Sequence, residues 1–281
     1  MTSTVEFTSA AAEHRYARLI ESAAKTVVGL DFDGTLAPIV DDPTRALIHP
    51  GAPAVLLDLA DAVLAVAVIT GRPARQVLAL GGLEAVGSAL GDRGRELFVF
   101  GQYANERWSS TDRRVISPRP PHGLAGFLRD LPAVLRRADA ADAYVEQKGL
   151  AVAIHTRRLD DADPAFDRLV PVLSTLAARH DLIIEPGRQV VEVRSPGRHK
   201  GHAVHMLISE LNAEGFLFIG DDLGDLEAFD AVDELRERGL ATLLVCSASA
   251  EESALAERAD VVVSGPDGVL ELLRQVTADA G

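Results

Sequence analysis

Short apolar runs alternate with segments of helical periodicity over much of the chain. Continuous apolar runs of this kind are typical of parallel strands that are buried on both faces. We predict such strands at residues 26–30, 65–69, 97–101, 216–219, 241–246 and 260–263. Between them, apolar residues recur every three or four positions, which predicts helices at 13–25, 53–64, from after Pro73 to about 80, 200–212, from about 226, near 251 and at 269–276. This alternation predicts an α/β fold with a doubly wound parallel sheet.

The middle of the chain follows a different pattern. Residues 117–123 are rich in proline and are typical of a linker. Beyond them we predict two helices, each followed by a hairpin of short alternating strands: 124–137 with 143–146 and 150–156, then 163–180 with 182–185 and 189–193, the hairpins turning at Lys148-Gly149 and Pro186-Gly187. This order indicates an inserted α+β domain of the arrangement αββαββ. We therefore expect a discontinuous core of residues 13–118 and 196–281, and an inserted domain of residues 119–195.

Charge and composition narrow the possible partners. The chain has 281 residues and a formal net charge of −14, with no block of basic residues. This argues against nucleic acid or an anionic membrane as a partner. The amino terminus lacks the apolar core of a secretory signal, and the longest apolar run, 62–69, is far shorter than the roughly 20 residues that span a bilayer. The one cysteine, Cys246, ends a predicted core strand. We expect a cytoplasmic protein, either a monomer or a weak dimer.

Polar clusters follow three of the predicted core strands. They are Asp31 and Asp33, then Thr70 and Gly71, then Asp221, Asp222 and Asp225. Because the carboxyl ends of parallel strands meet at one edge of the sheet, these residues should lie close together where such folds bind ligands. Carboxylates gathered in this way raise one another's pKa, and a hard divalent cation such as Mg²⁺ relieves the repulsion.

The same residues could carry out phosphoryl transfer. Lys200 opens a predicted helix directly after the inserted domain. Together with Mg²⁺ it could hold a phosphoryl group, whose remaining oxygens could bind the Thr70 hydroxyl and the backbone N–H groups near Gly71. Positioning and charge stabilisation of this kind are most of what phosphoryl transfer requires.

Simpler interpretations compete with these assignments. Asp222 and Asp225 could be caps of the helix that follows them. Arg72 could contact substrate or pair with an acid. The charged residues of the predicted hairpins could be cross-strand pairs on a solvated face.

The order of these motifs resembles a known superfamily. Asp31-x-Asp33-Gly34-Thr35, Thr70, Lys200 and Gly220-Asp221-Asp222-x-x-Asp225 are similar to the four motifs of the haloacid dehalogenase superfamily. The inserted αββαββ unit resembles its larger type of cap domain. Three further stretches are similar to the trehalose-6-phosphate phosphatase family: 145–149 with Glu146 and Lys148, 155–157 with Arg157, and 191–194 with Glu192.

This resemblance implies a two-step, Mg²⁺-dependent hydrolysis of trehalose 6-phosphate. Asp31 would attack the phosphate and form an aspartyl-phosphate, and Asp33 would protonate the leaving oxygen and then activate water. The Asp31 carboxylate, the Asp33 carbonyl and Asp221 would bind Mg²⁺, with Asp222 or Asp225 orienting its waters or Lys200. Thr70, Gly71 and Lys200 would bind the phosphate. The sugar hydroxyls would bind to a set of cap residues, namely Glu146, Lys148, Arg157 and Glu192.

Two departures from the family pattern leave other functions open. Residues 101–104 read Gly-Gln-Tyr-Ala where the family carries a Gly-x-His-Gly-like element, and Ser195 lengthens the usual Arg-Pro step. The alternatives are a phosphatase for another sugar phosphate, such as sucrose phosphate or the phosphate of a trehalose-like pseudo-disaccharide, and a non-catalytic protein that senses sugar phosphates.

Overall fold

The structure is a computed structural model that describes residues 6–40, 42–187, 189–248 and 254–281. The chain divides into two compact units. The first combines the residues up to Ser117 with His199–Gly281, and the second is Pro118–Arg198. In the described residues, no helix is both long and apolar enough to cross a membrane.

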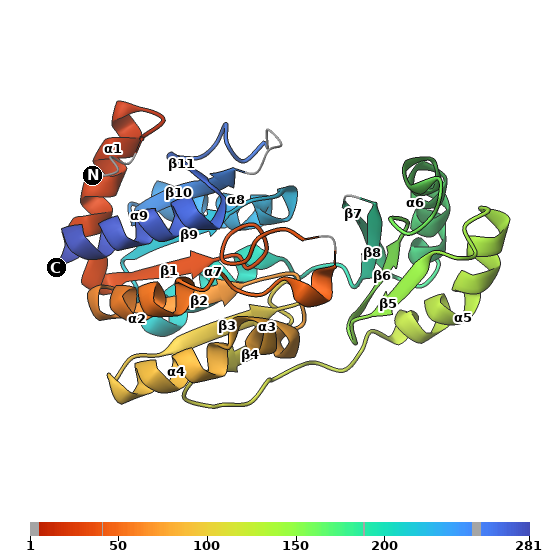
Figure 1. Cartoon of the computed structure of the whole chain (residues 1–281), viewed down its shortest axis with the longest axis horizontal. Coiled ribbons are helices and arrows are strands. Elements are labelled where there is room, and N and C mark those ends of the chain that lie inside the picture. Colours follow the sequence, from red (N-terminus) through yellow and green to blue (C-terminus); the bar gives the residue numbers. More distant parts are fainter. Residues whose placement is uncertain (1–5, 41, 188, 249–253) are drawn as a thin grey trace. The chain divides into compact units, whose positions relative to one another are not determined.

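A seven-stranded sheet forms the centre of the first unit (Figure 1). Its strands are β1 (Thr26–Leu30), β2 (Ala65–Ile69), β3 (Leu97–Gly101), β4 (Glu106–Ser109), β9 (Gly215–Gly220), β10 (Ala241–Ala248) and β11 (Val261–Ser264). They lie in the order β11-β10-β9-β1-β2-β3-β4, and all neighbours are parallel except the antiparallel pair β3 and β4. The predicted parallel α/β sheet is confirmed, with β1 at its centre.

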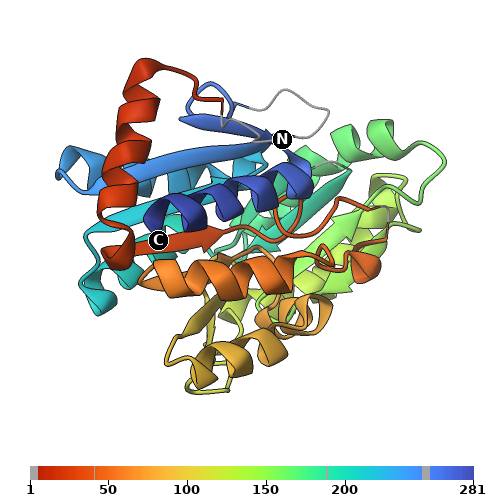
Figure 2. The same cartoon turned by 60° about the vertical axis from the view of Figure 1, so that its left-hand side comes forward.

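Helices cover both faces of this sheet. They are α1 (Ala10–Glu21), α2 (Ala52–Ala62), α3 (Ala74–Gly81), α4 (Leu83–Asp92), α7 (Lys200–Leu211), α8 (Leu226–Glu237) and α9 (Gly265–Ala280). One core cluster joins α1, α2, α3, α4 and α9 to one face, and a second joins α7 and α8 to the other. Helices α2 and α9 run side by side across the first face, as Figure 2 shows in orange and dark blue. The fold is therefore a three-layer α/β/α arrangement.

Strand β1 shows how the sequence produces this arrangement. Val28 and Leu30 pack into the cluster on one face, and Val27 packs into the cluster on the other. Gly29 also faces the second cluster, where a Cβ would lie 2.9 Å from the Phe216 ring of β9. Glycine is required here because the large side chain of the neighbouring strand fills its space.

Three segments differ from the sequence predictions. Helix α4 was not predicted, because its glycines weaken the helical pattern. Packing explains one of these glycines, since a Cβ on Gly87 would lie 2.9 Å from the Trp108 ring. Strand β4 was not predicted either. The turn predicted at Pro186-Gly187 is wrong, because both residues belong to a strand. The helix predicted near residue 251 lies outside the described residues.

The second unit is an α+β domain. Helices α5 (His122–Arg137) and α6 (Ala162–Ala178) accompany the strands β5 (Tyr144–Gln147), β6 (Ala151–His155), β7 (Ile183–Gly187) and β8 (Val190–Arg194). The four strands form an antiparallel sheet in the order β5-β6-β8-β7. One sheet face, including Val152, Ile154, Val191 and Val193, packs with α5 and α6 in a separate core. The inserted unit thus has the predicted arrangement αββαββ.

Candidate active site

A buried ion-pair network lies where β1 and β9 end. Asp31 follows β1 and donates its backbone N–H to the carbonyl of Ile219, 2.9 Å away in β9. Lys200, the first residue of α7, places its Nζ 2.8 Å from Asp31 Oδ1 and 2.7 Å from Asp225 Oδ1. All three side chains are almost completely buried. Residues from opposite ends of the chain therefore meet at this edge of the sheet.

Asp221 completes a cluster of three acids. Carboxylate oxygens of Asp31, Asp221 and Asp225 all lie within 4.8 Å of one another. Asp221 packs directly against the turn after Asp33, because a Cβ on Gly34 would lie 2.0 Å from Asp221 Oδ2. Gly34 also has a φ of +67°, a conformation that glycine adopts without strain. Only glycine at this position allows the acid and the turn to approach so closely.

Burial dominates the electrostatics of this cluster. It raises the pKa of Asp31 to about 8 in spite of Lys200, and Asp225 adds to the effect. It also raises the pKa of Asp221 to about 10, with a further contribution from Asp31. Burial alone would lower the pKa of Lys200, but Asp225 and Asp31 outweigh it and hold that pKa well above its ordinary value. Lys200 is thus a permanent cation among acids that favour protonation.

The residues of the cluster fit a divalent cation. Hard oxygen donors suit Mg²⁺ or a similar ion, and positive charge would relieve the repulsion that raises the pKa values of Asp31 and Asp221. Asp225 is already engaged by other partners. Its Oδ1 contacts Lys200, and its Oδ2 accepts the backbone N–H of Asp221 at 3.1 Å. Asp31 and Asp221 are therefore the better candidates for metal-binding carboxylates.

Asp222 and Asp225, which the sequence left equivalent, have different surroundings. Asp222 is exposed, and its Oδ1 accepts the N–H of Gly224 at 2.9 Å, which caps the short 3₁₀ helix η3 (Leu223–Asp225). Asp225 is fully buried against Lys200. The capping interpretation fits both acids, because Asp225 Oδ2 accepts the N–H of Asp222 in return. Asp225 is in addition the acid that holds the lysine.

The Asp33 side chain forms an ion pair with Arg72. Arg72 donates from Nε to Asp33 Oδ2 at 2.6 Å and from Nη2 to Asp33 Oδ1 at 2.7 Å. The same guanidinium donates from Nη1 to the carbonyl of Pro43 at 2.8 Å. Of the two interpretations of Arg72, pairing with an acid is the one that the structure contains.

Thr70 and its neighbours form the loop that follows β2. The Thr70 hydroxyl is buried and accepts the backbone N–H of Arg72 at 3.1 Å. An oxygen that accepts in this way still has its own proton to donate. Gly71 lies next to the ring of Tyr103, whose Cζ and Oη would both be 3.0 Å from a Cβ at that position.

Ser247 is a contact that the sequence analysis did not identify. This fully buried residue of β10 donates its hydroxyl to the carbonyl of Gly34 at 2.7 Å. The Gly34 turn is therefore bonded to Ser247 of β10 and packs against Asp221, which follows β9. A serine at the end of an apolar strand gives little local signal, because its partner is 213 positions away.

The second unit carries its polar residues on one face of its sheet. Glu146 lies opposite Ala153, and Ala153 lies opposite Glu192, so the two glutamates share a face with a small residue between them. Lys148 pairs with Glu192 at 2.5 Å, and His155 Nε2 lies 3.0 Å from Glu146 Oε2. Arg157 is exposed in the turn after β6.

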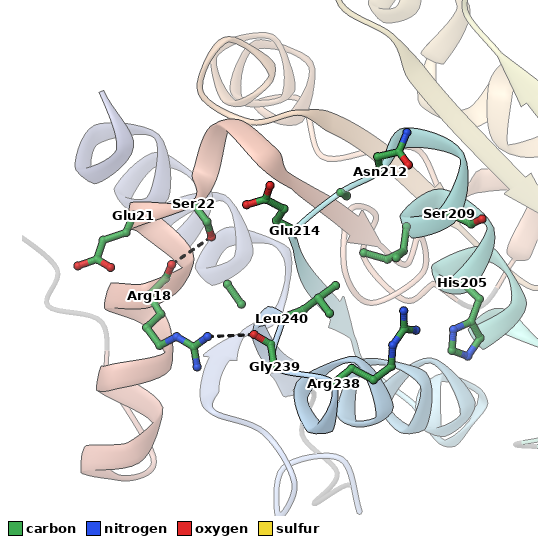
Figure 3. A pocket seen from close by; sticks show the side chains of 13 residues that line it. Arg18, Glu21, Ser22, His205, Ser209, Asn212, Glu214, Arg238, Gly239 and Leu240 are labelled. Carbon is green, nitrogen blue, oxygen red and sulfur yellow. Dashed lines mark hydrogen bonds between the residues drawn. The ribbon is translucent and has the colours of Figure 1, made fainter.

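A separate cavity of about 1050 Å³ lies at the opposite edge of the large sheet (Figure 3). It is lined from the end of α1, from α7, and from the segments that lead into β9 and from α8 into β10. Arg18 donates to the carbonyl of Gly239 at 3.1 Å, and Ser22 donates to the carbonyl of Arg18. These side chains satisfy backbone carbonyls at helix ends, so the cavity needs no ligand to explain its polar lining.

Comparison with known proteins agrees with the motifs. The sequence pattern of the trehalose-phosphatase family matches residues 134–264. A trehalose-phosphate phosphatase from Mycobacterium avium (strain 104) is 33% identical over 214 residues, which cover 73% of this chain and 51% of that protein. The chain spans about half the length of the curated trehalose-phosphate phosphatases that it matches.

Solved structures share the fold. The C-terminal domain of Candida albicans trehalose-6-phosphate phosphatase superposes with a TM-score of 0.76 and 18% identity, covering 98% of this chain and 99% of that one. A haloacid dehalogenase-like hydrolase from Bacteroides thetaiotaomicron gives a TM-score of 0.63 and 15% identity, with 89% and 99% covered. At these identities the likeness concerns the fold, which is of the haloacid dehalogenase type.

Proposed function

We propose that this chain, whose residues 134–264 match the trehalose-phosphatase family, is a phosphatase that hydrolyses trehalose 6-phosphate to trehalose and phosphate. The observation that carries the proposal is the buried contact of Lys200 with Asp31 beside Asp221. A lysine, a nucleophilic carboxylate and a further metal-binding acid are the parts that transfer of a phosphoryl group needs.

In the first step, an Asp31 oxygen attacks phosphorus while the bond from phosphorus to the sugar oxygen breaks. Asp33 gives its proton to that oxygen, which leaves as a hydroxyl of trehalose. In the second step, Asp33 takes a proton from water, whose oxygen attacks phosphorus and releases Asp31 and inorganic phosphate. Lys200 stabilises negative charge on the phosphoryl oxygens throughout, because its raised pKa keeps it protonated.

The proposed cation is Mg²⁺, held by the carboxylates of Asp31 and Asp221 and by the backbone carbonyl of Asp33. When bound, it supplies positive charge for the phosphoryl oxygens. Asp225 orients Lys200, and Asp222 supports the loop that carries Asp221 and Asp225. Thr70 and the N–H of Gly71 donate to the remaining phosphoryl oxygens.

We further propose that the polar sheet face of the second unit recognises the disaccharide. Glu146, Lys148, Glu192 and Arg157 would form hydrogen bonds with its hydroxyls. Binding through several directed hydrogen bonds favours substrates that carry hydroxyls in the matching positions. Glu192 is 7% exposed and pairs with Lys148, which supports a preformed site rather than two independent surface charges.

One screen tests the substrate. Phosphate release from trehalose 6-phosphate, sucrose 6-phosphate and glucose 6-phosphate is measured with Mg²⁺ and with a chelator. We expect trehalose 6-phosphate to have the highest kcat/KM and the chelator to abolish turnover. A preference for another sugar phosphate would support the alternative phosphatase, and binding without phosphate release would support a sensor.

The variant Asp31→Asn tests the mechanism. We expect no turnover of any phosphate ester, together with retained binding of inorganic phosphate and an unchanged circular dichroism spectrum. Measurable turnover by this variant would exclude Asp31 as the nucleophile.

A further inference from the structure

A left-handed turn without glycine connects β3 to β4. Gln102, Tyr103 and Ala104 have φ values of 46°, 57° and 65°. Residues with a Cβ adopt this conformation only at an energetic cost, and runs of three are unusual. Such strain persists where the surrounding structure over-determines it, and it concentrates at functional sites.

Backbone hydrogen bonds attach this turn to the loop after β2. The N–H of Gln102 donates to the carbonyl of Arg72 at 2.9 Å, and the N–H of Tyr103 donates to the carbonyl of Thr70 at 3.1 Å. The turn is closed from the other side by Asn105, whose backbone and side-chain N–H groups both donate to the carbonyl of Gln102. The strained conformation therefore fixes Tyr103 against the loop that carries Thr70.

The side chain of Tyr103 reaches Gly71 with its polar end. Its Oη and Cζ would lie 3.0 Å from a Cβ at Gly71, which is tighter than an ordinary van der Waals contact. The tyrosine is half-buried beside this loop. Gly71 thus has a specific role, which is to leave room for a phenol next to the proposed phosphate-binding groups.

We infer that Tyr103 is a further substrate-contacting residue, whose phenolic O–H donates a hydrogen bond to an oxygen of the phosphoryl group. This inference rests on the proposed phosphate site at Thr70 and Gly71. A ring that only packs would need no strained backbone to aim it, and a glycine-containing turn would connect the two strands at a lower cost. The strain is explained if the position of the phenol matters for binding.

The test uses Tyr103→Phe, which removes the hydroxyl and keeps the ring. Binding of inorganic phosphate in the presence of Mg²⁺ is measured by calorimetry, and kcat/KM is measured for trehalose 6-phosphate and p-nitrophenyl phosphate. A lost neutral hydrogen bond corresponds to a change of about three- to tenfold. We expect phosphate affinity and both kcat/KM values to fall by this factor, with the melting temperature unchanged.

Tyr16→Phe is the matched control. Tyr16 donates to Asp279 Oδ2 at 2.7 Å in the same unit, between α1 and α9 on one face of the sheet. We expect this variant to lose stability and to keep its phosphate affinity.

Gly71→Ala provides a second route to the same result. The added methyl group should displace the phenol and weaken phosphate binding. In a Tyr103→Phe background the same change should have little further effect, because there is no hydroxyl left to displace. Additive effects of the two changes would contradict the inference.

The measurements distinguish a failure of the inference about Tyr103 from a failure of the proposed substrate. Unchanged phosphate affinity in Tyr103→Phe would overturn the inference and make the residue a packing residue. A loss confined to trehalose 6-phosphate would also overturn it, because the phenol would then contact the sugar. If the wild-type protein hydrolyses p-nitrophenyl phosphate but not trehalose 6-phosphate, the proposed substrate fails. Phosphate binding would still decide the role of Tyr103 in that case.

Discussion

Arg72 holds Asp33 by both oxygens of its carboxylate, with N–O distances of 2.6 and 2.7 Å. Each of these oxygens keeps a second lone-pair direction that a proton or another donor can use. Asp33 is the proposed acid and base, and Arg72 fixes the position of its carboxyl group for that role. Arg72 also donates to the carbonyl of Pro43, which fixes the guanidinium on the loop that follows Asp33. Arg72 is therefore a positioning residue for the proton-transfer step.

Replacing Arg72 by alanine should leave Asp33 without its orienting partner. We expect kcat for trehalose 6-phosphate and for p-nitrophenyl phosphate to fall together by about 10- to 100-fold, within the range that a positioned proton donor contributes. Steady-state kinetics measure this, and Arg72→Lys should recover little because lysine cannot bind both oxygens. Arg258→Ala is the control, since Arg258 pairs with Asp230 and Asp233 on the surface. Equal losses in both alanine variants would contradict the assignment.

The acidic cluster should make the metal-free protein less stable as pH rises. Asp31 and Asp221 have folded-state pKa values raised to about 8 and about 10, mainly by burial. Their contribution to stability is complete below the unfolded pKa, near 4, and is lost as pH rises through the folded values. Each contributes a loss of about 1 kcal/mol per pH unit in that window. In chelator, the melting temperature of the wild type should therefore fall between pH 5.5 and 8.5 relative to Asp221→Asn.

Adding Mg²⁺ should reverse this effect. A cation that binds only the folded state stabilises it by mass action. We expect several degrees of increase in the melting temperature of the wild type at pH 8, and almost none in Asp221→Asn. Equal stabilisation of both proteins would show that the cation binds elsewhere.

Ser247 should matter for turnover although it is remote from the reacting atoms in sequence. Ser247→Ala removes the donor to the Gly34 carbonyl and frees the turn after Asp33. We expect kcat to fall about tenfold for both esters, since misplacement of a catalytic group is costly even when small. Ser110→Ala is the control, because the Ser110 hydroxyl also bonds a backbone group, the Leu97 N–H, in the same unit. A loss of stability without a loss of kcat would make Ser247 purely structural.

Glu192 should separate sugar recognition from chemistry. Glu192→Ala removes the partner of Lys148 on the polar face of the second unit. We expect KM for trehalose 6-phosphate to rise at least tenfold, as loss of a charged hydrogen bond predicts, while p-nitrophenyl phosphate turnover is unchanged. The exposed pair of Asp161 and Arg168 provides a control in Asp161→Ala. A similar loss on both esters would indicate that Glu192 supports the fold.

Local pattern was sufficient for most of the secondary structure. The strands β1, β2 and β3 begin and end at the predicted residues, because an uninterrupted apolar run bounded by polar residues has few alternatives. Helix α4 and strand β4 escaped prediction because their pattern depends on packing between them, where Gly87 leaves room for Trp108. In the sequence, a glycine that leaves room for a neighbouring side chain cannot be told from a glycine that ends a helix.

The sequence by itself determined which residues would gather at one edge of the sheet. Parallel strands place their carboxyl ends together, so Asp31, Lys200 and Asp221 could be grouped from the order of elements alone. Only the tertiary structure decided which side chains bond to which. Asp225 rather than Asp222 holds Lys200, Arg72 holds Asp33 and Ser247 holds Gly34, across separations of 25, 39 and 213 positions. Hydrogen bonds are sensitive to differences of a few tenths of an ångström in the distance from donor to acceptor. The packing of the folded chain sets these distances, and the local sequence pattern does not.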